Sequence, residues 1–210
     1  MRFTEGLRVC AMVATVSLVG AGVAHAGATV TSFKSNGANA SVNSFNGSTA
    51  FDIGVSTNTQ QSSGTTTFLS FNLQTCDFTT FSCSGTFGFG SIPNADFSVN
   101  GANATLNTNT ATNPNFTVFN YVQDSNGNFT QSPGVGGIVT ISWKKDQRQS
   151  TSFKGISTTV SGAFSDSVNG SQNSDSAPAN GSVLGTPLPA NSAGFIGTAS
   201  QKQTIISRSH

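Results

Sequence analysis

Short segments in which apolar and polar residues alternate recur along most of the chain. In FLSFNLQT, Leu69, Phe71 and Leu73 fall on one face, and polar residues with Phe68 fall on the other. Strict alternation in short runs that are rich in β-branched and aromatic residues predicts strands with one buried face. The same pattern occurs in TFGFGSI, NFTVFNYV and GIVTISWK, which begin at Thr86, Asn115 and Gly137.

Asn-Gly pairs separate many of these segments. Both residues accept positive φ, so the pair is a common centre of tight hairpin turns. No stretch after the N-terminal region has helical periodicity. The pattern predicts an all-β fold, an antiparallel β-sandwich or a sandwich-like barrel. The pairs lie at 36–37, 46–47, 100–101, 126–127, 169–170 and 180–181.

One longer motif occurs twice. FKSNGANASVNS begins at Phe33 and FSVNGANATLNT begins at Phe97, and both share the sequence NGANA. We predict an internal duplication with units at 33–96 and 97–164, against the alternative that a biased composition produces the match by coincidence. The remainder, 165–210, is expected to form a C-terminal loop and a last strand.

The first 26 residues have the pattern of a secretory signal peptide. Arg2 and Arg8 precede a short apolar run, and small residues at Ala24 and Ala26 fit a cleavage site after Ala26. A membrane anchor is the alternative, but the run is short and rich in Gly and Ala. We therefore expect residues 27–210 to be a single all-β domain without a membrane span, secreted to the cell exterior or to the periplasm.

Export would leave a chain with very little charge. Removing Arg2, Glu5 and Arg8 leaves seven basic residues and seven Asp, hence no net charge. Nucleic-acid binding depends on clustered Lys and Arg, so this composition argues against it. About half of the remaining chain is Ser, Thr, Asn or Gly, but sixteen phenylalanines indicate a folded core rather than disorder.

Two cysteines, Cys76 and Cys83, flank a six-residue loop between two predicted strands. Neighbouring strands hold Cα atoms at a separation that suits a disulfide, and export supplies an oxidising compartment. Zinc would need more ligands than this stretch offers, and a redox pair is more often Cys-x-x-Cys. The sequence predicts a structural disulfide.

The densest charge lies in KKDQRQ. If the second unit repeats the first, this stretch is the tip of a hairpin whose return strand carries Lys154. Such a cluster could contact an acidic partner or an anionic glycan, or it could simply keep a strand edge soluble. The residues of this candidate contact are Lys144, Lys145, Arg148 and Lys154.

Few residues could support catalysis. The only histidine after residue 26 is His210, a poor candidate for a catalytic triad. A glycosidase would need two nearby carboxylates, and nothing in the sequence pairs any two of the Asp residues. DSNGNF, from Asp124, resembles the start of a calcium loop, but a hairpin turn explains it better. We expect no catalytic residue, metal or cofactor, with an Asp-based hydrolase as a remote alternative.

These observations favour a non-enzymatic surface, matrix or adhesion component, acting through self-assembly or an extracellular glycan. A carbohydrate-binding module is the second hypothesis. It would need exposed aromatic rings, for which Tyr121 and Trp143 are the candidates, although both could equally be core residues. Unprotected edge strands at 29–35 or 195–207 would favour self-assembly by strand addition.

Overall fold

The computed structural model describes residues 28–46, 48–146, 150–154 and 164–208. Most of them belong to strands of two antiparallel sheets, and the one short helical element among them is the 3-10 turn η1 (Asn94–Asp96). The predicted all-β, antiparallel fold is therefore confirmed. The predicted signal peptide lies outside the described residues.

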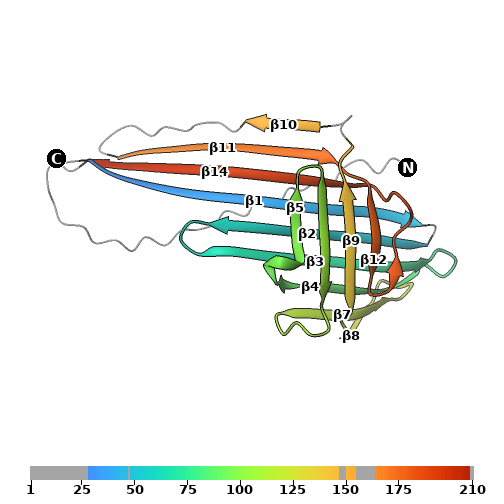
Figure 1. Ribbon diagram of the computed structural model, residues 1–210. Helices are drawn as coiled ribbons and strands as arrows, with labels where there is room; N and C mark the ends of the chain where they lie inside the picture. Colours follow the sequence, from blue (N-terminus) through green and yellow to red (C-terminus); the bar gives the residue numbers. More distant parts are fainter. Residues whose placement is uncertain (1–27, 47, 147–149, 155–163, 209–210) are drawn as a thin grey trace.

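The larger sheet has nine strands and the smaller sheet has five (Figure 1). In spatial order, the nine-stranded sheet consists of β10 (Ser150–Lys154), β11 (Phe164–Ser176), β14 (Gly194–Arg208), β1 (Ala28–Asn46), β2 (Thr49–Gln60), β3 (Gly64–Asp77), β4 (Ser82–Ile92), β7 (Phe116–Gln123) and β8 (Phe129–Pro133). The five-stranded sheet consists of β13 (Thr186–Pro187), β12 (Ala179–Val183), β9 (Ile138–Lys144), β6 (Asn103–Asn109) and β5 (Phe97–Asn100).

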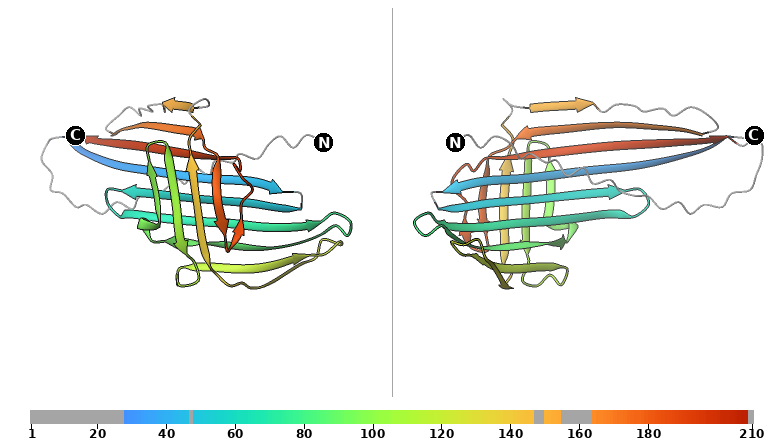
Figure 2. Two further views of the ribbon diagram at one scale, coloured as in Figure 1. Left: turned by 45° about the vertical axis from the view of Figure 1, so that its right-hand side comes forward. Right: turned by 180° about the vertical axis from the view of Figure 1, so that it is seen from behind.

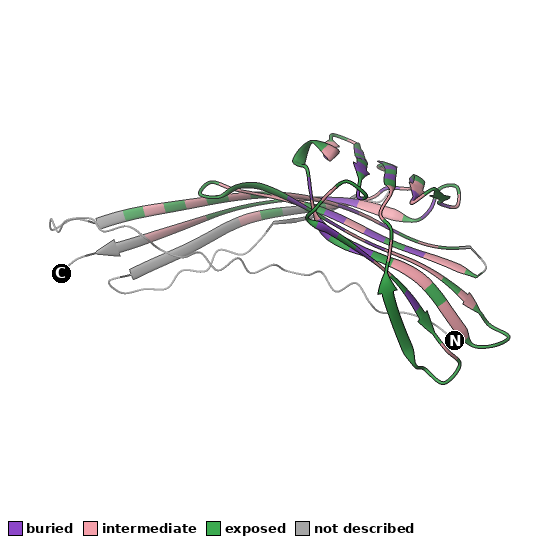
Figure 3. Ribbon diagram, turned by 90° about the horizontal axis from the view of Figure 1, so that it is seen from below, coloured by how far each residue is buried: buried purple, intermediate pink, exposed green. Residues whose placement is uncertain are grey.

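The small sheet lies across one face of the large sheet, with its strands running crosswise to those beneath it (Figure 2). Alternate residues of both sheets meet between the layers, and the buried positions gather where the layers overlap (Figure 3). Burying one face of each strand in this way follows directly from the two-residue period. The long strands of the large sheet continue well beyond the overlap, so the two-layer part covers only some of the molecule.

Aliphatic residues fill most of the core. Of the fourteen phenylalanines whose burial the structure describes, only Phe51, Phe71, Phe97 and Phe116 are buried. Seven others are exposed, so the prediction that alternating phenylalanines form the core is right only in part. Val, Ile, Leu, Ala and the single Trp supply the rest, including Val42, Ile53, Leu69, Val139, Ile141 and Ile196.

Strand β4 shows why some phenylalanines point outwards. Gly88 faces the core, where the rings of Phe71 and Phe116 stack with their centroids 5.8 Å apart. A Cβ atom at Gly88 would lie 2.4 Å from the Phe71 ring and 2.8 Å from the Phe116 ring. Neighbouring strands thus fill the core side of β4, and strand alternation then places Phe87 and Phe89 on the opposite face.

Only some of the Asn-Gly pairs form turns. Those at 100–101 and 126–127 lie in hairpin turns, where Gly101 and Gly127 have φ of 58° and 82°. The pairs at 36–37, 169–170 and 180–181 lie inside β1, β11 and β12, which corrects the prediction for these three. Each is hydrogen-bonded within a longer ladder, so sheet pairing overrides the local turn preference.

The two copies of the NGANA motif therefore differ in structure. The first is extended within β1, and the second forms the turn between β5 and β6, where Asn100 pairs with Asn103. The strands that follow the first copy all join the large sheet, whereas those that follow the second are divided between the two sheets. The two predicted units thus differ in sheet membership, and the duplication itself stays a prediction.

Two further predictions about the C-terminal part need correction. β9 and β10 lie in different sheets and do not pair as the predicted hairpin, and residues 147–149 of KKDQRQ lie outside the described residues. The expected loop after residue 164 contains β11, β12 and β13. The predicted last strand exists as β14, but it runs between β1 and β11 and is not an edge strand.

The disulfide prediction is confirmed. Cys76 and Cys83 are directly paired across β3 and β4, with Cα atoms 4.1 Å apart, and they are joined by a disulfide bond. The bond closes the end of a long hairpin whose loop is Phe78–Phe81. Its position supports a structural role.

Candidate functional site

Three strands of the large sheet extend beyond the β2–β3 hairpin as a narrow ribbon (Figure 1). The ribbon consists of Ala28–Lys34 of β1, Lys202–Arg208 of β14 and Phe164–Asn169 of β11, with β14 in the middle. β2 pairs with β1 only from Ser35 onward, and β10 pairs with β11 only from Ser171 onward. Among the described residues, both outer edges of the ribbon therefore lack a strand partner.

The direction of the backbone groups along the β1 edge follows from one hydrogen bond. The backbone N–H of Gln61 donates to the carbonyl oxygen of Lys34 at 3.1 Å, on the β2 side of β1. Alternate residues of an antiparallel strand point their backbone groups to the same side. Ala28, Val30 and Ser32 therefore direct both N–H and C=O to the open edge.

The sequence along this edge suits strand pairing. Residues 28–33, ATVTSF, contain no charge and no proline, and three of the six are β-branched. Native proteins protect edge strands with Lys, Pro, bulges or short length, and none of these interrupts this segment. The other end of the large sheet is different, since β8 is only five residues long and ends at Pro133.

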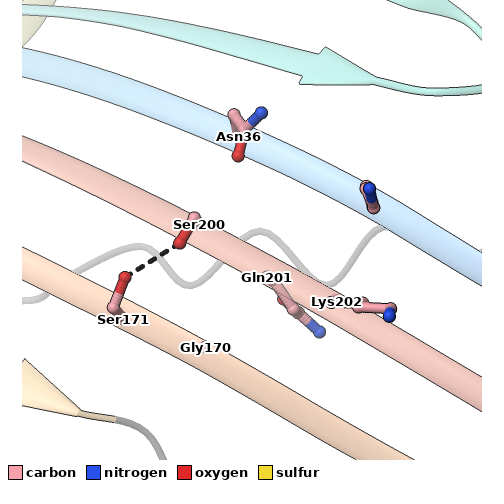
Figure 4. Close-up of a pocket in the computed structure, with 7 residues that line it drawn as sticks. Asn36, Gly170, Ser171, Ser200, Gln201 and Lys202 are labelled. Carbon is pink, nitrogen blue, oxygen red and sulfur yellow. Dashed lines mark hydrogen bonds between the residues drawn. The ribbon is translucent and has the colours of Figure 1, made fainter.

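A shallow depression lies on one face of this region, over β1, β14 and β11 (Figure 4). Lys34 and Lys202 are direct cross-strand partners there, and both are exposed. Ser171 and Ser200 are joined by a side-chain hydrogen bond of 2.8 Å between β11 and β14. Two like charges directly opposite each other weaken strand pairing slightly, so the lysine pair does not stabilise the ribbon.

A second feature is a row of aromatic rings on the face of the large sheet that points away from the small sheet. We call it the outer aromatic strip. Phe87 and Phe119 are direct partners across β4 and β7, and the ring of Phe89 lies 5.5 Å from Phe87 and 6.3 Å from Phe119. Phe68 on β3 adjoins this group. The strip comprises Phe68, Phe87, Phe89, Phe119, Tyr121 and Phe129.

Tyr121 anchors one end of this strip. Its hydroxyl donates a 3.0 Å hydrogen bond to the Asn72 side chain on β3, so the ring must pass over β4. It passes at Gly85, where a Cβ atom would lie 2.6 Å from the Tyr121 hydroxyl oxygen. Phe129 stacks against Tyr121 with centroids 5.4 Å apart, and only 8% of Tyr121 is exposed. Burial raises the pKa of Tyr121.

Trp143 lies elsewhere. It belongs to β9 of the small sheet, is 1% exposed, and donates an indole hydrogen bond to the backbone of β1. Trp143 and Tyr121 therefore belong to different sheets and share no open face. The predicted glycan platform made of these two residues does not form, because both rings are used in packing.

The structure places only part of the predicted basic contact. Lys145 forms an ion pair with Asp175, with 2.5 Å between Nζ and Oδ2, and Asp175 itself is buried. Lys144 is exposed at the end of β9. Arg148 and the side chain of Lys154 lie outside the described residues. Lys145 thus has a structural partner within the chain.

Two acidic residues, Asp77 and Asp124, accept hydrogen bonds within hairpin turns. The Asp77 carboxylate accepts hydrogen bonds from the Thr79 hydroxyl and N–H and from the Thr80 hydroxyl, which lower its pKa to about 2. Asp124 accepts bonds from Asn126 and Asn128, and the Asn128 side chain is the main cause of its lowered pKa. DSNGNF is thus a hairpin turn, as predicted. Within the described residues, no group of three or more His, Cys, Asp or Glu could hold a metal ion.

Comparisons with known proteins do not assign the chain to a family. No protein-family model matches the chain, and no curated protein has a similar sequence. Among the described residues, no helix is long and apolar enough to cross a membrane.

The outer aromatic strip is the main feature that the sequence analysis did not identify as a site. Its signal was present, since FGFG alternates phenylalanine with glycine and NFTVFNYV has aromatic residues on both faces. Strand alternation alone does not tell which face is buried, so the sequence did not show that these rings lie together on an open face.

Proposed function

We propose that the protein is an exported, non-enzymatic β-sandwich component of a cell surface or extracellular matrix, which joins other chains by adding strands at the open edge of β1. Export is supported by the signal-peptide pattern and by the Cys76–Cys83 disulfide, since disulfides persist in oxidising compartments. The proposed assembly rests on the segment Ala28–Phe33, which has β14 as its one strand partner among the described residues.

Strand addition fits the chemistry of this edge. An added strand would bond to the outward N–H and C=O groups of Ala28, Val30 and Ser32, each such bond contributing about 1 kcal/mol net. The β-branched side chains of Thr29, Val30 and Thr31 would pack against side chains of the added strand. The uncharged character of residues 28–33 means that no like-charge repulsion opposes this pairing.

The test is a proline at an edge position. Ser32→Pro removes an N–H that has no strand partner in the described chain, so we expect the fold to tolerate it. The exported wild-type protein should form larger species as its concentration rises, measured by sedimentation velocity, and Ser32→Pro should remain small. Ser32→Ala keeps the N–H and serves as the matched control, which should assemble like the wild type.

A wild-type protein that stays monomeric at every accessible concentration would contradict the proposal. Equal assembly by wild type and Ser32→Pro would also contradict it. Urea unfolding of each variant checks that the proline has acted on the edge and not on the whole fold.

A further inference from the structure

The outer aromatic strip leaves a large amount of apolar ring surface in contact with water. Phe68, Phe87, Phe89 and Phe129 are 36%, 36%, 38% and 59% exposed. At about 200 Å² per ring, these four side chains present roughly 350 Å². An exposed patch of this size on one face of a small protein is often a binding site.

The packing of β4 fixes this exposure. Phe87 and Phe89 cannot exchange faces with Gly88, since the Phe71 and Phe116 rings occupy the space where a side chain at Gly88 would lie. Gly85 likewise leaves room for the Tyr121 ring. The strip is thus held in place by the same contacts that build the core.

The rings form two groups of neighbours on this face: Phe87, Phe89 and Phe119 make one, and Tyr121 and Phe129 make the other. The planes of Phe89 and Phe119 are inclined by 25°, those of Phe87 and Phe89 by 35°, and those of Tyr121 and Phe129 by 21°. Neighbouring centroids lie between 5.4 and 6.3 Å apart. This spacing is comparable to that of consecutive sugar rings in an extended polysaccharide.

The polar residues paired directly with the rings of the strip are neutral, and one carboxylate, Asp52 of β2, lies on the same face as the partner of Asn72. On the outer face, Ser70 and Asn72 of β3 are the partners of Phe89 and Phe87, and Thr117 of β7 is the partner of Phe89. Gln131 of β8 is the partner of Tyr121. Hydroxyl and amide groups next to aromatic rings can bond sugar hydroxyls while the rings contact the apolar C–H faces of the sugars. No Lys or Arg belongs to these positions, which disfavours nucleic acid or an acidic glycan.

The available area argues against a second copy of the chain as the occupant. A stable interface between proteins buries about 800 Å² on each partner, more than twice what the exposed rings of the strip present. A single polysaccharide chain needs much less. We infer that the outer aromatic strip binds a neutral polysaccharide laid across β3, β4, β7 and β8.

The test compares retention of the exported protein on four insoluble or gel-embedded neutral probes: cellulose, chitin, β-1,3-glucan and starch. The Ser32→Pro background is used throughout, so that assembly through the β1 edge does not affect the result. We expect binding to at least one probe, and the double variant Phe87→Ala/Phe89→Ala should lose at least tenfold in affinity. Phe81→Ala is the matched control, because Phe81 is 78% exposed but lies in the disulfide-closed loop outside the strip.

Three outcomes would overturn the inference. The first is no retention on any of the four probes. The second is retention that Phe87→Ala/Phe89→Ala leaves unchanged although its urea midpoint shows that it is folded. The third is an oligomer in the Ser32→Pro background that the double variant converts to monomer, which would assign the strip to a second copy. Failure here leaves the strand-addition proposal intact, because that proposal is tested by assembly in the absence of polysaccharide.

Discussion

The indole Nε1 of Trp143 donates a 2.8 Å hydrogen bond to the backbone carbonyl oxygen of Ser41, 102 residues earlier in the chain. Trp143 belongs to β9 of the small sheet and Ser41 to β1 of the large sheet, so this bond joins the two layers. Gly194 at the start of β14 makes room for the indole, since a Cβ atom there would lie 3.1 Å from Trp143 Cδ1.

Trp143→Phe should therefore destabilise the protein. The change removes the hydrogen bond and leaves part of the indole volume empty, which together should cost about 2 kcal/mol in the free energy of unfolding. Urea denaturation measures the loss. Val135→Ala is the control, because Val135 is 82% exposed and its truncation should change the unfolding free energy by less than ~0.5 kcal/mol. An unchanged midpoint in Trp143→Phe would show that the layers do not depend on this contact.

Gly85→Ala should be more harmful than an ordinary glycine substitution. The new Cβ atom would lie 2.2 Å from the Leu73 carbonyl oxygen and 2.6 Å from the Tyr121 hydroxyl, so the backbone and the ring must both move. We expect a loss of about 2–3 kcal/mol, measured by thermal or urea unfolding. Gly54→Ala is the matched control in the same sheet, because its Cβ would meet only Ser70 Oγ, at 3.6 Å. Equal effects of the two substitutions would refute the packing argument.

Lys145→Met should destabilise the protein although it removes a charge from a basic stretch. The Asp175 side chain is only 11% exposed, and removal of Lys145 breaks the ion pair that it forms there. Since the pair is partly accessible to solvent, we expect a loss of about 2 kcal/mol in unfolding free energy. The exposed neighbour gives a control, as Lys144→Met should have little effect. Identical stability of the two variants would mean that the ion pair contributes nothing.

The carboxyl group of Asp77 should have a pKa well below that of an ordinary aspartate. The Thr79 hydroxyl, the Thr79 N–H and the Thr80 hydroxyl bond to its charged form and lower its pKa from 3.8 to about 2. Because the folded-state pKa is depressed, the stability from this group is complete above pH 3.8 and is lost as the pH falls through about 2. NMR titration of the carboxyl carbon measures the midpoint. Thr79→Val should move the midpoint upwards, towards 3.8, without moving that of Asp124, whose carboxylate bonds to Asn126 and Asn128.

Local sequence was sufficient to predict the strands and the disulfide. Alternation around Leu69, Phe71 and Leu73, and around Val139, Ile141 and Trp143, assigns strands with one buried face because side chains alternate strictly in extended backbone. Cys76 and Cys83 could be paired because a short hairpin loop between strands brings its two ends together. These features depend on residues within about ten positions of one another.

The identical NGANA segments show where such prediction fails. Asn36-Gly37 stays extended because β14 and β2 hydrogen-bond to β1 on both sides, whereas Asn100-Gly101 forms a turn where β5 meets β6. The conformation of the same five residues thus depends on the strands that pair with them, and one of these, β14, lies more than a hundred positions away in the chain.

The sequence by itself determined that this chain forms antiparallel strands and one disulfide-closed hairpin, since backbone alternation and short loops are local properties. Only the tertiary structure decided which face of each strand is buried and which edge is open. Phe71 and Phe116 occupy the core side of β4 and Phe87 and Phe89 face outwards, because the small sheet covers one face of the large sheet and not the other. The β1 edge is open for a similar reason: β2 ends at Gln60, before it could pair with residues 28–33.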